Sequence, residues 1–262
     1  MKMNRREDLL RSIGAVGLVA LTGCRVLPAE EQPREAGAAV PTSGPGPSTG
    51  EQPTEGVVVA TGSQPQASHT PSCVLTPQQA EGPFYFDPKQ VRRDVTEGRP
   101  GASMQLALRV VEAGTCRPIR DALVDIWHAD AAGLYSGYGG QGDNRGVDTS
   151  GEAFLRGIQI TDTDGLVRFA SIYPGWYPSR AVHVHFKVRF ANQTAVTSQL
   201  YFPEEVTDRV YAEAPYNLRG RRARTNQTDI LLRGDPEAQN LLAEVSPASA
   251  GYRAALTIGI AS

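Results

Sequence analysis

Residues 181–190 read AVHVHFKVRF, and this strict alternation constrains the fold more than any other stretch of the chain. Side chains of a β-strand point to opposite faces with a period of two. One face is therefore apolar and the other polar, with Val182, Val184, Phe186, Val188 and Phe190 against His183, His185, Lys187 and Arg189. The pattern predicts a strand that buries one face in a core and projects both histidines from the other.

Short segments of the same kind recur along the chain. They are rich in β-branched and aromatic residues, and Gly, Pro or Asp bounds most of them; examples are 104–112 (MQLALRVVE), 122–127 (ALVDIW) and 252–260 (YRAALTIGI). Many short strands with turn signals between them predict an all-β, antiparallel β-sandwich with few short helices.

Three further segments carry local signals. Residues 161–169, TDTDGLVRF, predict a β-hairpin, because Asp164-Gly165 can adopt positive φ. Residues 204–212, EEVTDRVYA, are a helix candidate, and residues 235–245, DPEAQNLLAEV, fit either a helix or a strand.

The chain begins MKMNRREDLLRSIGAVGLVALTGC, a basic start followed by a short apolar run and a small-residue pattern ending in cysteine. The run is too short to span a bilayer and fits a signal peptide. Residues 1–24 are therefore interpreted as a lipoprotein signal with lipidated Cys24, which predicts an exported protein held at the cell envelope by a lipid anchor. The Arg5-Arg6 pair is an imperfect twin-arginine signal, so the export route stays open. The alternative is a chance apolar start on a cytosolic protein.

Residues 25–71 are rich in Pro, Gly, Ser, Thr and Glu, and such a segment buries too little apolar surface to fold. We expect a disordered tether at 25–71 and one domain at 72–262. The net charge of −2 gives no indication of a nucleic-acid partner.

Three cysteines are present. If Cys24 carries lipid, Cys73 and Cys116 remain, and the oxidising compartment of an exported protein favours a disulfide between them. The alternative is two unpaired buried thiols.

Two histidines on one strand face can share a metal ion, although a solvent-facing strand is the simpler alternative. A catalytic zinc site would need a third ligand, and His128 is as easily a polar residue at a strand end. Tyr135 and Tyr177 are the unusual candidates, since a phenol with a pKa near 10 binds only a strongly Lewis-acidic cation such as Fe(III). Taken singly, each tyrosine is more often a packing residue.

Four stretches carry a resemblance to a known family. They are EGPFY (81–85), ALVDIWHADAAGLYS (122–136), FLRGIQITDTDGLVRFASIYPGWYPSRAVHVHF (154–186) and SQLYF (198–202). The chain resembles the intradiol ring-cleavage dioxygenases, the family of protocatechuate 3,4-dioxygenase and catechol 1,2-dioxygenase. The similarity extends from about residue 76 to the C-terminus.

The resemblance implies a function and a set of site residues. Tyr135, Tyr177, His183 and His185 would bind a non-haem Fe(III), Tyr177 being the ligand that substrate displaces. Arg180 would stabilise charge developing on the substrate, and Gln199 matches a glutamine beside the ligands. The reaction implied is cleavage of a catechol between its hydroxylated carbons by O2, giving a cis,cis-muconate-type diacid.

The resemblance leaves the substrate and the oligomeric state open. Where catechol 1,2-dioxygenases have a long helical dimerisation segment, this sequence has the proline-rich tether, so we expect it to lie outside that subgroup. Nothing indicates a second chain type, and the lipid signal and expected disulfide fit exported members of the family. Pocket-lining residues are expected after Glu81 and in the loop 137–146, where Arg145 is either a contact for an acidic substituent or an exposed loop residue. The alternatives are a non-catalytic prealbumin-like binding module and a zinc hydrolase.

Overall fold

The computed structural model describes residues 73–261, all of which fall within one compact unit. The expected signal peptide, the lipidated Cys24 and the tether lie outside the described residues and stay predictions. Within the described part of the chain, no helix has the length and apolar character needed to cross a membrane.

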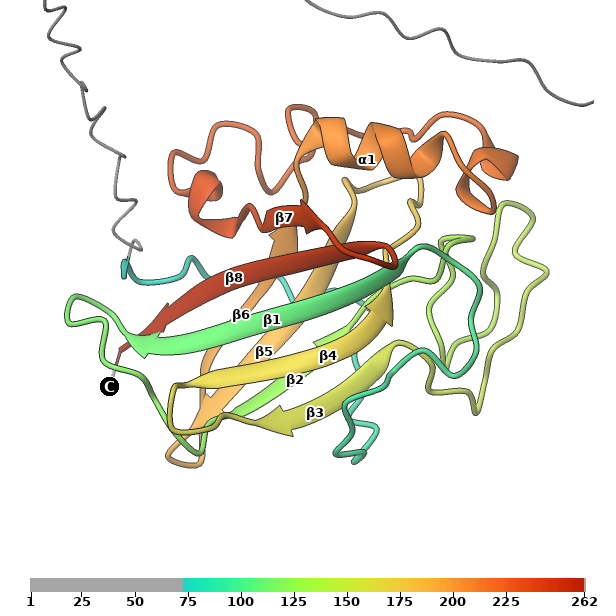
Figure 1. Ribbon diagram of the computed structural model, residues 1–262. Coiled ribbons are helices and arrows are strands. Elements are labelled where there is room, and N and C mark those ends of the chain that lie inside the picture. Colours follow the sequence, from blue (N-terminus) through green and yellow to red (C-terminus); the bar gives the residue numbers. More distant parts are fainter. Residues whose placement is uncertain (1–72, 262) are drawn as a thin grey trace, which may run out of the picture. The chain divides into compact units, whose positions relative to one another are not determined.

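The described residues fold into two four-stranded sheets (Figure 1). One sheet has the order β4-β1-β8-β7 and the other β3-β2-β5-β6. The strands are β1 Ser103–Glu112, β2 Leu123–Trp127, β3 Arg156–Ile160, β4 Leu166–Ile172, β5 His183–Phe190, β6 Gln193–Tyr201, β7 Glu244–Pro247 and β8 Tyr252–Ile260. The expected all-β sandwich is confirmed. One pairing was not anticipated: β1 and β8 run parallel, while the other pairs are antiparallel.

The core lies between the two sheets and is built from the alternating apolar positions. Val184, Phe186 and Val188 of β5 are fully buried there, as the alternation predicts. They join Leu106, Leu108 and Val110 of β1, Val124 and Ile126 of β2, and Ala254, Leu256 and Ile258 of β8. Because these residues fill the inner face of the sheet, His183 and His185 point to its outer face.

The hairpin expected at residues 161–169 is wrong, although its turn forms. Asp162 Oδ1 accepts the N–H groups of Asp164 and Leu166, both at 2.9 Å, and Gly165 has φ of +71°. The flanking strands nevertheless pair elsewhere, β3 with β2 and β4 with β1, so the turn is a corner between the two sheets. A local turn signal cannot distinguish these outcomes, because distant strands decide the pairing.

The helix candidate at residues 204–212 is confirmed as α1, Glu204–Tyr211. The ambiguous segment at 235–245 divides into a short 3₁₀ helix, Ala238–Leu241, and the start of β7. A second 3₁₀ helix spans Tyr216–Arg219.

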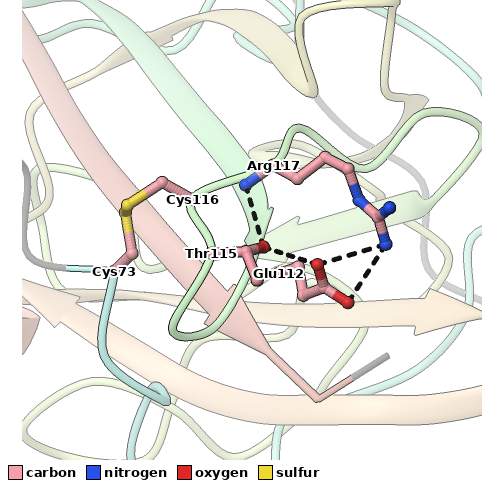
Figure 2. Close-up of a disulfide and its surroundings, with 5 residues drawn as sticks. All are labelled: Cys73, Glu112, Thr115, Cys116 and Arg117. Atoms are coloured by element: carbon pink, nitrogen blue, oxygen red, sulfur yellow. Dashed lines mark hydrogen bonds and ion pairs between the residues drawn. A yellow bond between two sulfur atoms is a disulfide. The ribbon is translucent and has the colours of Figure 1, made fainter.

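The described chain begins with an N-terminal arm, residues 73–86, that a disulfide fixes to the sandwich. Cys73 and Cys116 are bonded, as expected, with their Cα atoms 5.2 Å apart (Figure 2). Cys116 lies in the turn after β1, next to Thr115 and Arg117, which both contact Glu112. From this anchor the arm runs along β6, where Gln79 N–H donates to Thr197 O at 2.9 Å, and reaches the outer face of the β3-β2-β5-β6 sheet.

Candidate metal centre

His183 and His185 open β5, and the register of the neighbouring strands decides what surrounds them. Tyr201 and Gln199 of β6 lie opposite His183 and His185, and Trp127 of β2 lies opposite His185 on the other side. The histidines are only 3% and 2% exposed, respectively, which rules out the solvent-facing strand. Both imidazoles are therefore buried on the outer face of the sheet, beneath the arm and the β2–β3 connection.

Two tyrosines from separate connections converge on the same point. Tyr177 lies in the turn before β5 and Tyr135 in the connection after β2. Their Oη atoms are 3.1 Å and 3.4 Å from His183 Nε2, and His185 Nε2 is 3.0 Å from it. The structure thus brings together all four ligands that the resemblance implied.

The glycine-rich loop at 137–146 fixes the main chain of Tyr135. Gln141 Oε1 accepts the Tyr135 N–H at 2.8 Å, and Gln141 Nε2 donates to the Tyr135 carbonyl at 2.6 Å. Thr149 Oγ1 donates to the same carbonyl at 2.7 Å. The side chain is held from above by Phe84 of the arm, whose ring stacks on Tyr135 with centroids 4.6 Å apart.

His185 is enclosed from both sides. The Trp127 ring lies parallel to it, with centroids 4.8 Å apart and planes 6° from parallel. On the other side the arm passes at Gly82, where a Cβ atom would come within 3.3 Å of His185 Cε1 and where φ is +77°. Both the close approach and the positive φ favour glycine at this position.

The electrostatics keep both histidines neutral. Burial, with the nearby Arg180 cation adding to it, lowers the pKa of His183 to about 3. Burial and His183 lower the pKa of His185 well below its usual range. His183 Nδ1 is 2.6 Å from the Ala181 carbonyl, so Nδ1 carries the proton and Nε2 presents a lone pair.

This donor set fits a ferric ion. Burial raises the pKa of Tyr135, and that of Tyr177, above the ordinary phenol value, so phenolates here require a strongly Lewis-acidic cation. His183 and His185 bring their Nε2 atoms within 3.0 Å of each other, and neutral imidazole nitrogens are common iron ligands. Among residues 73–261 no three His, Cys, Asp or Glu side chains form a metal-binding cluster, because half of this donor set is phenolic.

Arg180 borders the centre and is held by three side chains. Its Nε donates to Asp229 Oδ2 at 2.9 Å, and its Nη2 donates to Gln199 Oε1 and Tyr201 Oη, both at 2.7 Å. Gln199 is fixed in turn, since its Nε2 donates to the Ala80 carbonyl at 2.8 Å. The structure therefore brings both Arg180 and Gln199 to the centre, as the resemblance implied.

Sequence reasoning missed two charged residues near the centre. Asp229 is fully buried, and no motif in its surroundings distinguished it from other loop aspartates. Arg156, at the start of β3, is 1% exposed and holds Ser136 through Nε to Oγ and Nη2 to O, both at 2.8 Å. Burial lowers the pKa of Arg156 to about 10, so it remains a cation beside Tyr135. The position of Arg156 at a strand end gave no signal that it would bond Ser136 or place a positive charge beside Tyr135.

His128 lies apart from the four donors. Its Nδ1 is 2.9 Å from the Ala129 carbonyl and its Nε2 is 2.7 Å from Ser171 Oγ. Both ring nitrogens are thus engaged, which confirms a polar residue just beyond the end of β2.

A cavity of about 230 Å³ adjoins Tyr177. Gly142, Asp143 and Arg145 of the glycine-rich loop line it, together with Gly133, Pro178 and Arg219. Arg145 is exposed, as the simpler interpretation expected, but it also faces the space next to Tyr177. A larger cavity, about 620 Å³, lies on the outer face of the other sheet and contains none of the predicted site residues.

Comparison with known proteins shows the family to which the chain belongs. The chain is 32% identical over 132 residues to the protocatechuate 3,4-dioxygenase beta chain of Burkholderia cepacia, covering 47% of this chain and 53% of that protein. It spans about half the length of the curated relatives it matches.

Two solved structures share the fold over most of the described residues. One is an intradiol ring-cleavage dioxygenase from Tetranychus urticae (29% identity, TM-score 0.66, covering 72% of this chain and 95% of that one). The other is the dioxygenase domain of a dioxygenase carbohydrate-binding protein fusion from Streptomyces sp. SirexAA-E (30% identity, TM-score 0.51, covering 71% and 98%). The family model described as dioxygenase matches residues 79–218, more than half of the chain, and this chain belongs to the intradiol ring-cleavage dioxygenases.

Proposed function

We propose that this protein is a non-haem Fe(III) intradiol dioxygenase, which cleaves a catechol-type ring between its hydroxylated carbons with O2 and yields a cis,cis-muconate-type diacid. The observation that carries the proposal is the convergence of two imidazole nitrogens and two phenol oxygens at one buried point beside an arginine. Neither a non-catalytic binding module nor a zinc hydrolase needs this donor set.

His183, His185, Tyr135 and Tyr177 would hold the iron. When bound, ferric iron favours the deprotonated catechol and gives its ring carbon the carbanion character that reacts with O2. Tyr177 adjoins a cavity and comes from a turn, so it can move aside and accept a catechol proton at Oη. Arg180, a permanent cation, would stabilise negative charge developing on the substrate. Trp127 and the arm exclude water from His185.

The proposal predicts a coloured holoenzyme that consumes catechols. Iron–phenolate sites absorb visible light through charge transfer, so the iron-loaded protein should be red to burgundy. Oxygen uptake should equal catechol loss, and mass spectrometry should find both atoms of labelled O2 in the diacid. A colourless protein with one iron per chain would contradict the proposal, and so would extradiol or hydrolytic products.

Arg145 is proposed to favour catechols with an anionic substituent, because it faces the cavity at Tyr177 and its guanidinium has no partner among residues 73–261. For an exposed charge pair we expect about 1 kcal/mol. The Arg145→Gln variant should therefore raise KM for protocatechuate and caffeate about fivefold, with catechol and hydroxyquinol unaffected. Steady-state kinetics measure KM for all four substrates. Arg168→Gln, on the other sheet, is the matched control and should leave each KM unchanged. Equal changes in KM for charged and neutral catechols would refute the assignment.

We also propose that the enzyme works outside the cytoplasm, attached to a membrane by lipid on Cys24. The Cys73–Cys116 disulfide supports this location, because such bonds persist in oxidising compartments and are rare in the cytosol.

A further inference from the structure

We infer that Asp229 is a positioning residue of this site, which fixes Arg180 so that one edge of its guanidinium stays available to the substrate. The inference rests on the proposed function and adds to it a residue far from every motif of the family resemblance. Asp229 lies in the connection between α1 and β7, 49 residues after Arg180.

The carboxylate of Asp229 is saturated with donors. Oδ2 accepts Arg180 Nε at 2.9 Å and the Ala181 N–H at 2.6 Å. Oδ1 accepts the Leu231 N–H at 2.8 Å and Arg180 Nη2 at 3.3 Å. Burial alone would raise the pKa of this carboxyl, but the bonds from Arg180, Ala181 and Leu231 hold it below its usual range. Asp229 is therefore a fixed anion with no exposed surface.

The contacts of Arg180 leave one nitrogen uncommitted. Nε and Nη2 carry the bonds to Asp229, Gln199 and Tyr201, and Nη1 has no hydrogen-bond partner within the described residues. Nη1 is also absent from the buried atoms that lack partners, so it reaches accessible space. Since a guanidinium is planar, fixing Nε and Nη2 fixes the direction of Nη1. A bound catecholate can therefore accept hydrogen bonds from the two N–H groups of Nη1.

Asp229 also connects the arginine to a metal ligand. The Ala181 N–H that it accepts belongs to the residue whose carbonyl is 2.6 Å from His183 Nδ1. One buried carboxylate therefore sets the guanidinium and steadies the backbone that orients His183. A carboxylate that only stabilised its loop would need the Leu231 contact alone.

A double-mutant cycle separates positioning from a general structural role. We expect Asp229→Asn to lower kcat about 10-fold and Arg180→Gln about 100-fold, the size of losing a transition-state donor. Asn accepts on only one side. With its oxygen at the Oδ2 position it keeps the Ala181 N–H, and hence the backbone at His183, but it loses the contact from Arg180 Nη2 to Oδ1. If Asp229 acts through Arg180, the double variant should match Arg180→Gln within about twofold. Asp130→Asn provides the control, because Asp130 Oδ1 accepts the Ala132 and Leu134 N–H groups and has no contact with Arg180 among the described residues. Any loss of kcat in Asp130→Asn should therefore multiply with the loss in Arg180→Gln.

A second readout needs no turnover. The dissociation constant of 4-nitrocatechol, titrated under argon by its visible spectrum on the iron-loaded protein, should rise about fivefold in Asp229→Asn and not at all when Arg180→Gln is already present. If the effects of Asp229→Asn and Arg180→Gln multiply in both kcat and the dissociation constant, the role of Asp229 is overturned while the proposed function stands. A wild type that neither binds nor cleaves a catechol would overturn the proposed function, and this inference with it.

Discussion

The His185→Ala variant is expected to lose its iron, its colour and its activity together. His185 supplies one of the four donors, and its Nε2 faces His183 Nε2 at 3.0 Å. Residues that only orient a metal ligand already change affinity by about 10- to 100-fold, so the loss of a ligand should cost at least about 100-fold. After purification and dialysis, elemental analysis should find well under one iron per chain.

Two control variants show whether this loss is specific to the centre. His128→Gln removes the described domain's other histidine, which bonds Ser171 and Ala129 away from the four donors, and should keep its iron and visible band. Tyr177→Phe removes the proposed displaceable ligand and should keep most of its iron, with a shifted band and slower turnover. Circular dichroism checks that each variant is folded. A folded, fully iron-loaded and coloured His185→Ala protein would remove His185 from the ligand set.

Local patterns in the sequence were enough to predict the strand that carries the histidines. The alternation at 181–190 needs no partner strand to decide which face enters the core, since the apolar residues settle it. The resemblance then supplied Tyr135, Tyr177, Arg180 and Gln199, which lie in different strands and connections, and the fold brings them together. Their roles as ligands and catalytic groups stay predictions, which the His185 and Arg180 variants test.

Other features depend on distant parts of the chain and have no local signal. The turn at 162–165 has hairpin chemistry, yet β3 pairs with β2 and β4 pairs with β1, so the two strands enter different sheets. Asp229 resembles any loop aspartate until the connection between α1 and β7 brings it to Arg180. Arg156 is buried because Ser136 and Tyr138 of the connection after β2 and Phe86 of the arm pack against it, whereas a strand-end arginine in isolation is expected at the surface.

Replacing Cys73 and Cys116 by serine together is expected to lower the free energy of unfolding by about 4 kcal/mol. The bond closes a loop with a sequence separation of 43 residues. The chain-entropy relation for a loop of that length gives about 4 kcal/mol at 25 °C. For a domain of ordinary stability this is a large fraction of the total. Urea unfolding of the oxidised wild type and the double variant measures the change through the midpoint and slope.

Loss of the disulfide should lower stability much more than activity, because other contacts also hold the arm. Beyond Cys73 it has contacts of its own, including Thr76 N–H to the Gly259 carbonyl and Gln79 N–H to the Thr197 carbonyl, both at 2.9 Å. These hold Gly82 and Phe84 over the centre without the disulfide, so kcat at 25 °C should stay within about twofold of wild type. Thr76→Ala is the control: it keeps the main-chain bond, loses only the Gly259 N–H bond to Thr76 Oγ1 (2.9 Å), and should cost only about 1 kcal/mol. A double variant that keeps its stability but loses kcat would instead assign the disulfide to positioning the arm.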